Sequence, residues 1–134
     1  MIRTTTSLVL AVLLAGLATV VSAQPTLKAN IPFDFQVRDK MLPAGEYEVL
    51  LDINVNNAVI VRNHQNPGLA VVVLTYAAVR PATEKPTAQF NRYGATHLLT
   101  TIWTESGRGY AVAPSKATRE LAKSRAEIKF VAMK

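Results

Sequence analysis

The sequence contains no cysteine. This absence excludes disulfide bonds and a lipid-modified N-terminal cysteine. Small exported domains commonly depend on disulfides, so a chain without them must rely on buried apolar surface for stability. Only two histidines are present, His64 and His97, and no short metal-ligand spacing such as H-E-x-x-H occurs. Because a zinc site needs three or four converging ligands, the sequence predicts no metal site.

Acidic residues are scarce, with 9 Asp and Glu against 15 Lys and Arg and a net charge of +6. Apart from Arg3, the excess is confined to residues 108–134, where Glu120 and Glu127 are the only acids. The side chains considered there as an anionic-partner site are Arg108, Lys116, Arg119, Lys123, Arg125 and Lys129. Such a segment attracts anionic polymers or membrane headgroups. The alternative interpretation is an ordinary solvated helix face.

Catalytic and nucleotide-binding motifs are absent. The chain has no nucleophile elbow, phosphate-binding loop or S-x-x-K pattern, and Gly107-Arg108-Gly109 is only half of a dinucleotide fingerprint. Glu46 and Glu48 lie on one face of a predicted strand, whereas glycosidase carboxylates flank a cleft. We therefore expect no enzymatic activity and no cofactor. The alternative is a small exported enzyme whose site is assembled from distant residues.

Long apolar runs are absent beyond the N-terminus. Leu8–Val21 is a nearly unbroken apolar segment, and Val21-Ser22-Ala23 provides small residues for cleavage before Gln24. Residues 1–23 therefore predict a signal peptide, and residues 24–134 a single β-rich domain that is periplasmic or extracellular. An uncleaved anchor is the alternative, although a membrane span needs about 20 apolar residues.

Alternating hydrophobicity predicts strands throughout the domain. From Ala29 to Val37 apolar and polar residues alternate strictly, which indicates a strand with one buried face. Pro32 cannot donate a ladder hydrogen bond, so this strand is expected at an edge. Residues 69–74 are apolar on both faces and predict a strand covered on both sides. The prolines within residues 76–86 predict a crossover loop.

A hairpin is predicted around Gly94-Ala95, because glycine in the first position favours a type II′ turn. The pairs that this register predicts are Phe90 with Leu99, Ala88 with Thr101, and Arg92 with His97. The expected core consists of Phe33, Phe35, Tyr47, Phe90, Leu99 and Trp103. Trp103 shares the predicted core face of the hairpin with Phe90.

The C-terminal region predicts one helix followed by a strand. Ser115 is an N-cap candidate, and good helix formers continue to Arg125, so we expect a basic helix at about 115–125. Lys116 and Glu120 are spaced for an ion pair on it. With about seven or eight short strands and one C-terminal helix, the chain predicts a mainly β fold, an antiparallel β-sandwich or small β-barrel.

Three segments form a distinctive combination: IPFDF at 31–35, LPAGEYEV at 42–49, and FNRYG at 90–94 with Trp103. Together they resemble a family of small secreted proteins that is abundant in acidobacteria. The family has no established activity, so the resemblance supports the β-rich fold and carries over no functional residues. Arg38 stands where the resemblance implies a glycine, and Asn91 where it implies a histidine.

These observations together predict an exported, non-enzymatic protein with a binding or envelope-structural role. Its expected partner is an anionic cell-envelope polymer or another envelope protein, which the basic C-terminal segment contacts through charge. Export makes nucleic acid an unexpected partner, and no membrane span is expected after cleavage of the signal peptide.

Overall fold

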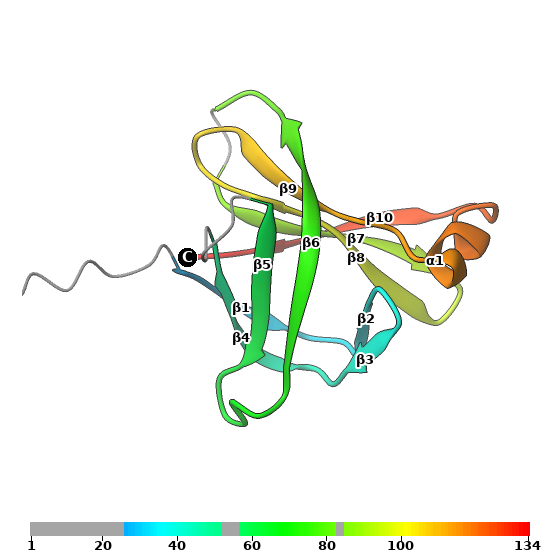
Figure 1. The fold of residues 1–134 in the computed structure, drawn as a ribbon, viewed down its shortest axis with the longest axis horizontal. Helices are drawn as coiled ribbons and strands as arrows, with labels where there is room; N and C mark the ends of the chain where they lie inside the picture. Colours follow the sequence, from blue (N-terminus) through cyan, green and yellow to red (C-terminus); the bar gives the residue numbers. More distant parts are fainter. Residues whose placement is uncertain (1–25, 52–56, 83–84) are drawn as a thin grey trace, which may run out of the picture.

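The computed structural model describes residues 26–51, 57–82 and 85–134. The predicted signal peptide over residues 1–23 lies outside the described residues. Within the described ranges the chain forms ten β-strands and one short α-helix (Figure 1). No helix in these ranges is both long and apolar enough to span a membrane. The fold is therefore mainly β with a single helix near the C-terminus, as the sequence predicts.

The elements follow one another as β1 (Thr26–Ile31), β2 (Phe35–Val37), β3 (Lys40–Leu42), β4 (Gly45–Leu50), β5 (Ala58–Asn63), β6 (Ala70–Val79), β7 (Thr87–Tyr93), β8 (Thr96–Trp103), β9 (Arg108–Val112), α1 (Lys116–Leu121) and β10 (Glu127–Ala132). They form one sheet in the order β1-β4-β5-β6-β9-β8-β2-β3, while β7 joins β8 to β10. Every pair is antiparallel except β2 with β8. The sheet is open and does not close into a barrel.

The first alternating segment forms two strands instead of one. Burial alternates through it as predicted, with Ile31 and Phe35 both facing the core. The ladder is interrupted at Pro32, however, and β1 pairs with β4 while β2 pairs with β3 and β8. Because proline has no N–H to donate, this is where the chain can leave one partner strand for another. This break, together with the short strand β3, helps to raise the number of strands above the predicted seven or eight.

The core lies between inward-facing side chains from distant parts of the sheet. Phe35 of β2 contacts Tyr47 of β4 edge to face, with ring centroids 4.9 Å apart, and contacts Phe90 of β7 at 5.6 Å. Phe35, Tyr47, Phe90 and Leu99 are at most 2% exposed, as predicted. Phe33 is partly buried and packs its ring edge to face with Phe90. These contacts join β4, near one end of the sheet, to β2 and β7, near the other end.

The β7–β8 hairpin has the predicted turn and half of the predicted register. Gly94 has φ of 61°, and Ala95 lacks a positive φ, which fits a type II′ turn and not a type I′ turn. Phe90 opposes Leu99 and Arg92 opposes His97, as predicted. A register shift between Gln89 and Phe90 then moves Ala88 opposite Ile102 instead of Thr101.

This register shift removes Trp103 from the predicted core. Because side chains alternate between faces, one extra residue on β8 exchanges the faces of all the residues beyond it. Ile102 is therefore 1% exposed in the core, while Trp103 is half-buried on the opposite face. There its Nε1 donates to Gln89 Oε1 at 2.9 Å, and the Arg80 guanidinium lies 4.9 Å from its ring.

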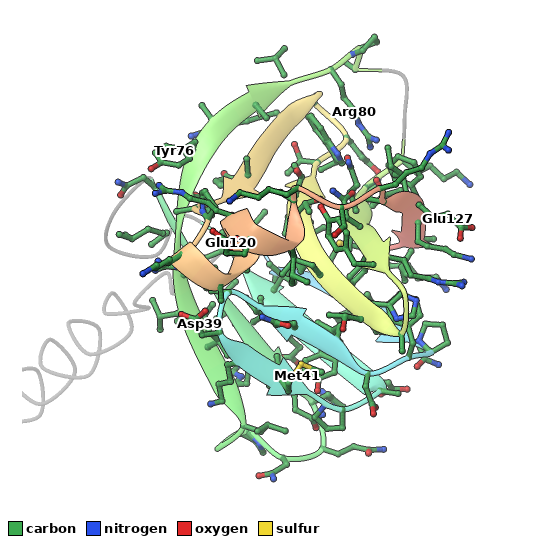
Figure 2. All side chains as sticks on the ribbon, turned by 90° about the vertical axis from the view of Figure 1, so that its right-hand side faces the viewer. Asp39, Met41, Tyr76, Arg80, Glu120 and Glu127 are labelled. Carbon is green, nitrogen blue, oxygen red and sulfur yellow. The ribbon has the colours of Figure 1, made fainter. Side chains whose placement is uncertain are left out.

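The strand expected to be covered on both sides is open on one side. β6 is central, between β5 and β9, but Val72, Leu74 and Tyr76 are more than half exposed on its outer face. Tyr76 points away from the molecule in Figure 2. β6 also continues to Val79, so the first part of the predicted crossover loop is strand. The apolar residues on the outer face of β6 therefore favour a strand through their β-propensity, although that face is not buried.

The helix α1 is shorter than predicted but begins where predicted. The Ser115 hydroxyl accepts from Thr118 N, and Ser115 N donates to Thr118 Oγ1, which together form a capping box. Ser115 Oγ also donates to Asp39 Oδ1 at 2.7 Å. This bond ties α1 to the β2–β3 turn, and Figure 2 shows Asp39 beside the helix.

Candidate functional site

The six basic residues predicted as an anionic-partner site occupy three places in the fold. Lys116 and Arg119 lie on α1, and Lys123 and Arg125 lie in the turn that follows it. Arg108 begins β9 and Lys129 lies in the middle of β10. The structure therefore brings four of the six together in one short segment.

Arg108 stands apart from the other five. It occupies the first position of β9, whereas α1 lies beyond the last residue of that strand (Figure 1). Its guanidinium lies 5.3 Å from the ring centroid of Tyr110, a cation–π distance. Arg108 therefore lies outside the group of basic residues on and after α1.

Lys129 belongs to a network on β10 and β7. Its Nζ lies 3.4 Å from Glu127 Oε1, and Glu127 Oε2 lies 3.6 Å from Arg92 Nη1. The Glu127 carboxylate thus neutralises part of the charge at this end of the sheet.

The remaining four residues form what we call the α1 basic cluster: Lys116, Arg119, Lys123 and Arg125. All four are exposed. Lys123 pairs with Glu120 at 3.1 Å, which replaces the predicted pair of Lys116 with Glu120. Lys116, Arg119 and Arg125 make no side-chain ion pair or hydrogen bond to another described residue. Their charge is available to a partner.

A cavity of about 240 Å³ lies beside this cluster, between α1 and strands β7 and β8. Arg119 is at its margin, and Arg38 reaches it from the β2–β3 turn. Asn91 and Tyr93 of β7 also line it, with Asn91 Nδ2 donating to Tyr93 OH at 3.3 Å. Arg38 is not among the site residues that the sequence predicts. Its one signal in the sequence is the arginine at a position where the family resemblance implies a glycine.

Arg38 adopts an unusual backbone conformation at this cavity. Its φ is 54°, the only positive φ outside glycine among the described residues. The left-handed region is where a glycine is favoured. Its carbonyl oxygen accepts a hydrogen bond from Gln36 Nε2, and the next residue, Asp39, is held by Ser115.

A second cavity, of about 500 Å³, lies along β1, β4 and the end of β10. Glu48 of β4 accepts a hydrogen bond from Arg62 Nη2 at 3.0 Å and contacts His64 Nδ1 at 2.9 Å. These hydrogen bonds, first from Arg62 and then from His64, lower the pKa of the Glu48 carboxyl. His64 and Glu48 line the cavity.

The lining of this second cavity limits its chemistry. Its described lining contains Lys28, Asn30, Glu46, Tyr47 and Lys134 but no serine, threonine or cysteine. The Tyr47 hydroxyl is committed to Pro43 O at 2.6 Å. In the described part of the chain, no group of three or more histidines, cysteines and acids is placed to hold a metal ion.

The second histidine has a structural environment. The His97 ring stacks on Phe33 with centroids 3.9 Å apart, and it lies opposite Arg92 as predicted. Burial lowers the pKa of His97, and the nearby charges of Arg92 and Lys129 lower it further. It therefore favours the neutral form.

Comparisons with known proteins add no assignment. No family model, curated protein or solved structure matches this chain. The resemblance to a secreted acidobacterial family stays a prediction. Function must therefore be argued from the residues of the sites themselves.

Proposed function

We propose that this protein is an exported, non-enzymatic binding protein that holds an anionic partner at the α1 basic cluster. The observation that carries this proposal is that Lys116, Arg119 and Arg125 lie on one exposed segment and form no ion pair with any residue the structure describes. Residues 24–134 carry 14 Lys and Arg against 9 Asp and Glu, and this net charge of +5 adds a long-range attraction for anions.

The predicted export of the chain supports a partner located in the cell envelope. The signal-like residues 1–23 and the absence of cysteine are consistent with a protein released beyond the inner membrane. The separate cations of the α1 basic cluster can bind repeating negative charges. We therefore favour an anionic cell-envelope polymer as the partner. A negatively charged surface of another envelope protein would use the same residues.

The proposal is tested by comparing two pairs of charge-removing substitutions. Lys116→Gln with Arg125→Gln removes charge from the α1 basic cluster, while Lys28→Gln with Lys85→Gln removes equal charge from other exposed positions. Retention is measured on immobilised polygalacturonate as a function of salt. We expect the first pair to elute at lower salt than the second, because exposed charges act over a screening length of about 8 Å at physiological salt.

Equal losses from the two pairs would contradict the proposal. In that case only net charge would matter, and α1 would present an ordinary solvated face.

A second candidate function rests on the contact of His64 with Glu48. A carboxylate that orients a histidine through Nδ1 leaves Nε2 free to accept a proton, as in a general base. Because the cavity lining has no hydroxyl or thiol nucleophile available, such a site would have to activate water.

Hydrolysis of p-nitrophenyl acetate separates the two functions. The binding proposal predicts a slow rate that rises linearly with substrate concentration, in the unchanged protein and in His64→Gln alike. A rate that saturates with substrate, and that loses this saturation in His64→Gln, would support the enzyme instead.

A further inference from the structure

The cavity beside α1 has an apolar lining with few polar groups. The apolar residues that line it are Leu98, Leu99, Val112, Ala113, Pro114 and Ala122. Thr118 is committed to the capping box, and Thr100 Oγ1 donates to Gln89 O. The groups left to meet a ligand come from Arg38, Asn91, Tyr93 and Arg119. Small-molecule sites have this composition, an apolar pocket with a small number of convergent polar groups.

Two buried polar atoms at this cavity lack partners. Arg38 Nε and Asn91 Oδ1 are both shielded from solvent and form no hydrogen bond within the part of the chain that the structure describes. Buried donors and acceptors in proteins are almost always paired, and each exception calls for an explanation. Here one donor and one acceptor without partners in the described chain belong to side chains that line the same cavity.

The backbone conformation of Arg38 is a second, independent indication of a functional site. An arginine at φ of 54° is strained, and a glycine would avoid the strain. Strained conformations are concentrated at functional sites, where the side chain has a use that the backbone alone does not explain. The side chain of Arg38 lines the cavity and makes no ion pair to a described residue.

We propose that this cavity binds a small organic acid with an apolar body and a hydroxyl group. The carboxylate would be held by the Arg38 guanidinium, with Arg119 adding charge at the margin, and the hydroxyl would meet the hydrogen-bonded side chains of Asn91 and Tyr93. A planar guanidinium matches a carboxylate, and the apolar lining disfavours a strongly hydrated phosphate. The volume of about 240 Å³ fits a ligand of single-ring size.

The test uses three related probes and isothermal titration calorimetry. 4-Hydroxyphenylacetate has both groups, phenylacetate lacks the hydroxyl, and 2-(4-hydroxyphenyl)ethanol lacks the carboxylate. We expect the first to bind tightest and the alcohol to bind about 10- to 100-fold more weakly, since it loses a charge-assisted contact. Equal binding of the acid and the alcohol, competition by inorganic phosphate at equal affinity, or no binding at millimolar concentration would each overturn the proposal.

Substitutions place the binding in this cavity. Arg38→Gly removes the guanidinium while relieving the backbone strain, so it should stay folded and lose acid binding by about 10-fold or more. Arg92→Gln removes an arginine from the same hairpin region that does not line the cavity, and it should keep the affinity. Asn91→Ala should abolish the preference for the hydroxylated acid. Unchanged acid binding in a folded Arg38→Gly protein would place the ligand elsewhere.

The acid-binding proposal and the proposed function at the α1 basic cluster can be disproved independently. Arg38→Gly should leave the difference between the two charge-removing pairs on polygalacturonate intact, and Lys116→Gln with Arg125→Gln should leave acid binding intact. If either variant abolished both, the assignment to a distinct cavity would be wrong.

Discussion

Arg38 carries a backbone conformation that the described chain otherwise leaves to glycine. Its φ of 54° resembles that of Gly94 at 61°. The left-handed region brings Cβ close to the following carbonyl and costs a residue other than glycine about 1–2 kcal/mol. The two positions therefore offer opposite substitutions with opposite expected effects.

Arg38→Gly should raise the free energy of unfolding by about 0.5–1 kcal/mol, because relief of strain exceeds the added freedom of the unfolded chain. Gly94→Ala should lower it by about 1 kcal/mol, since no atom stands near the added Cβ and only the conformation is at issue. Denaturant unfolding measures both. A loss of stability in Arg38→Gly would show that the side chain serves the fold more than a ligand.

Phe90 and Trp103 distinguish the core from the outer face of the hairpin. Phe90 is 0% exposed, so Phe90→Ala should cost about 3–5 kcal/mol. Trp103→Ala should cost less, because the ring is half-buried beneath Arg80 and its one hydrogen bond to a described residue is to Gln89. An equal cost in denaturant unfolding would contradict the observed register of β8.

The Glu48 carboxylate should make the free energy of unfolding fall as the pH is lowered into the acidic range. Because its pKa is lowered in the folded state from an ordinary value near 4.5, the ionised form stabilises the fold. This contribution is present above the unfolded pKa and is lost as pH falls through the folded pKa. The stability difference between the protein and Glu48→Gln should therefore persist at neutral pH and shrink below about pH 4. A difference that grew in acid would be incompatible with the carboxylate contacts.

At the scale of elements, α1 is held at its N-terminus. Ser115 caps the helix and also bonds Asp39 in the β2–β3 turn. Six residues are too few to be stable alone, so the helix depends on these contacts and on packing.

Ser115→Ala should therefore lower the free energy of unfolding by about 1–2 kcal/mol. Ser124→Ala is the matched control, because Ser124 is exposed beyond the helix and its side chain makes no hydrogen bond to a described residue. Thermal unfolding of both variants tests this. Similar small effects would mean that the cap contributes little.

Some features of these elements could be predicted from the sequence, and others could not. Ser115 was identifiable because capping is a local property, and Gly94-Ala95 because turn chemistry is local. The register shift near Gln89 was not, since either register keeps apolar residues on both faces of β8. The cavity at Arg38 was out of reach because its lining comes from the β2–β3 turn, β7, β8 and α1, whose meeting depends on the tertiary fold.

At the scale of the whole molecule, distant segments are joined into one open sheet. Lys28 N donates to Lys134 O and Lys134 N to Lys28 O, both at 2.9 Å, so the chain beyond β10 lies beside β1. The α1 basic cluster is displayed on the outside of this framework, next to the cavity that contains Arg38. Exposed cations and the cavity thus lie on one face, which we propose as the binding face.

The most direct test of that face is residue-by-residue NMR during titration with soluble polygalacturonate. We predict that amide shifts change first and most over residues 116–125, and that 0.5 M salt abolishes the changes because it shortens the screening length to about 4 Å. Changes centred on Lys28, Lys85 or Arg108, or spread evenly over all basic residues, would contradict an anionic-partner site at α1.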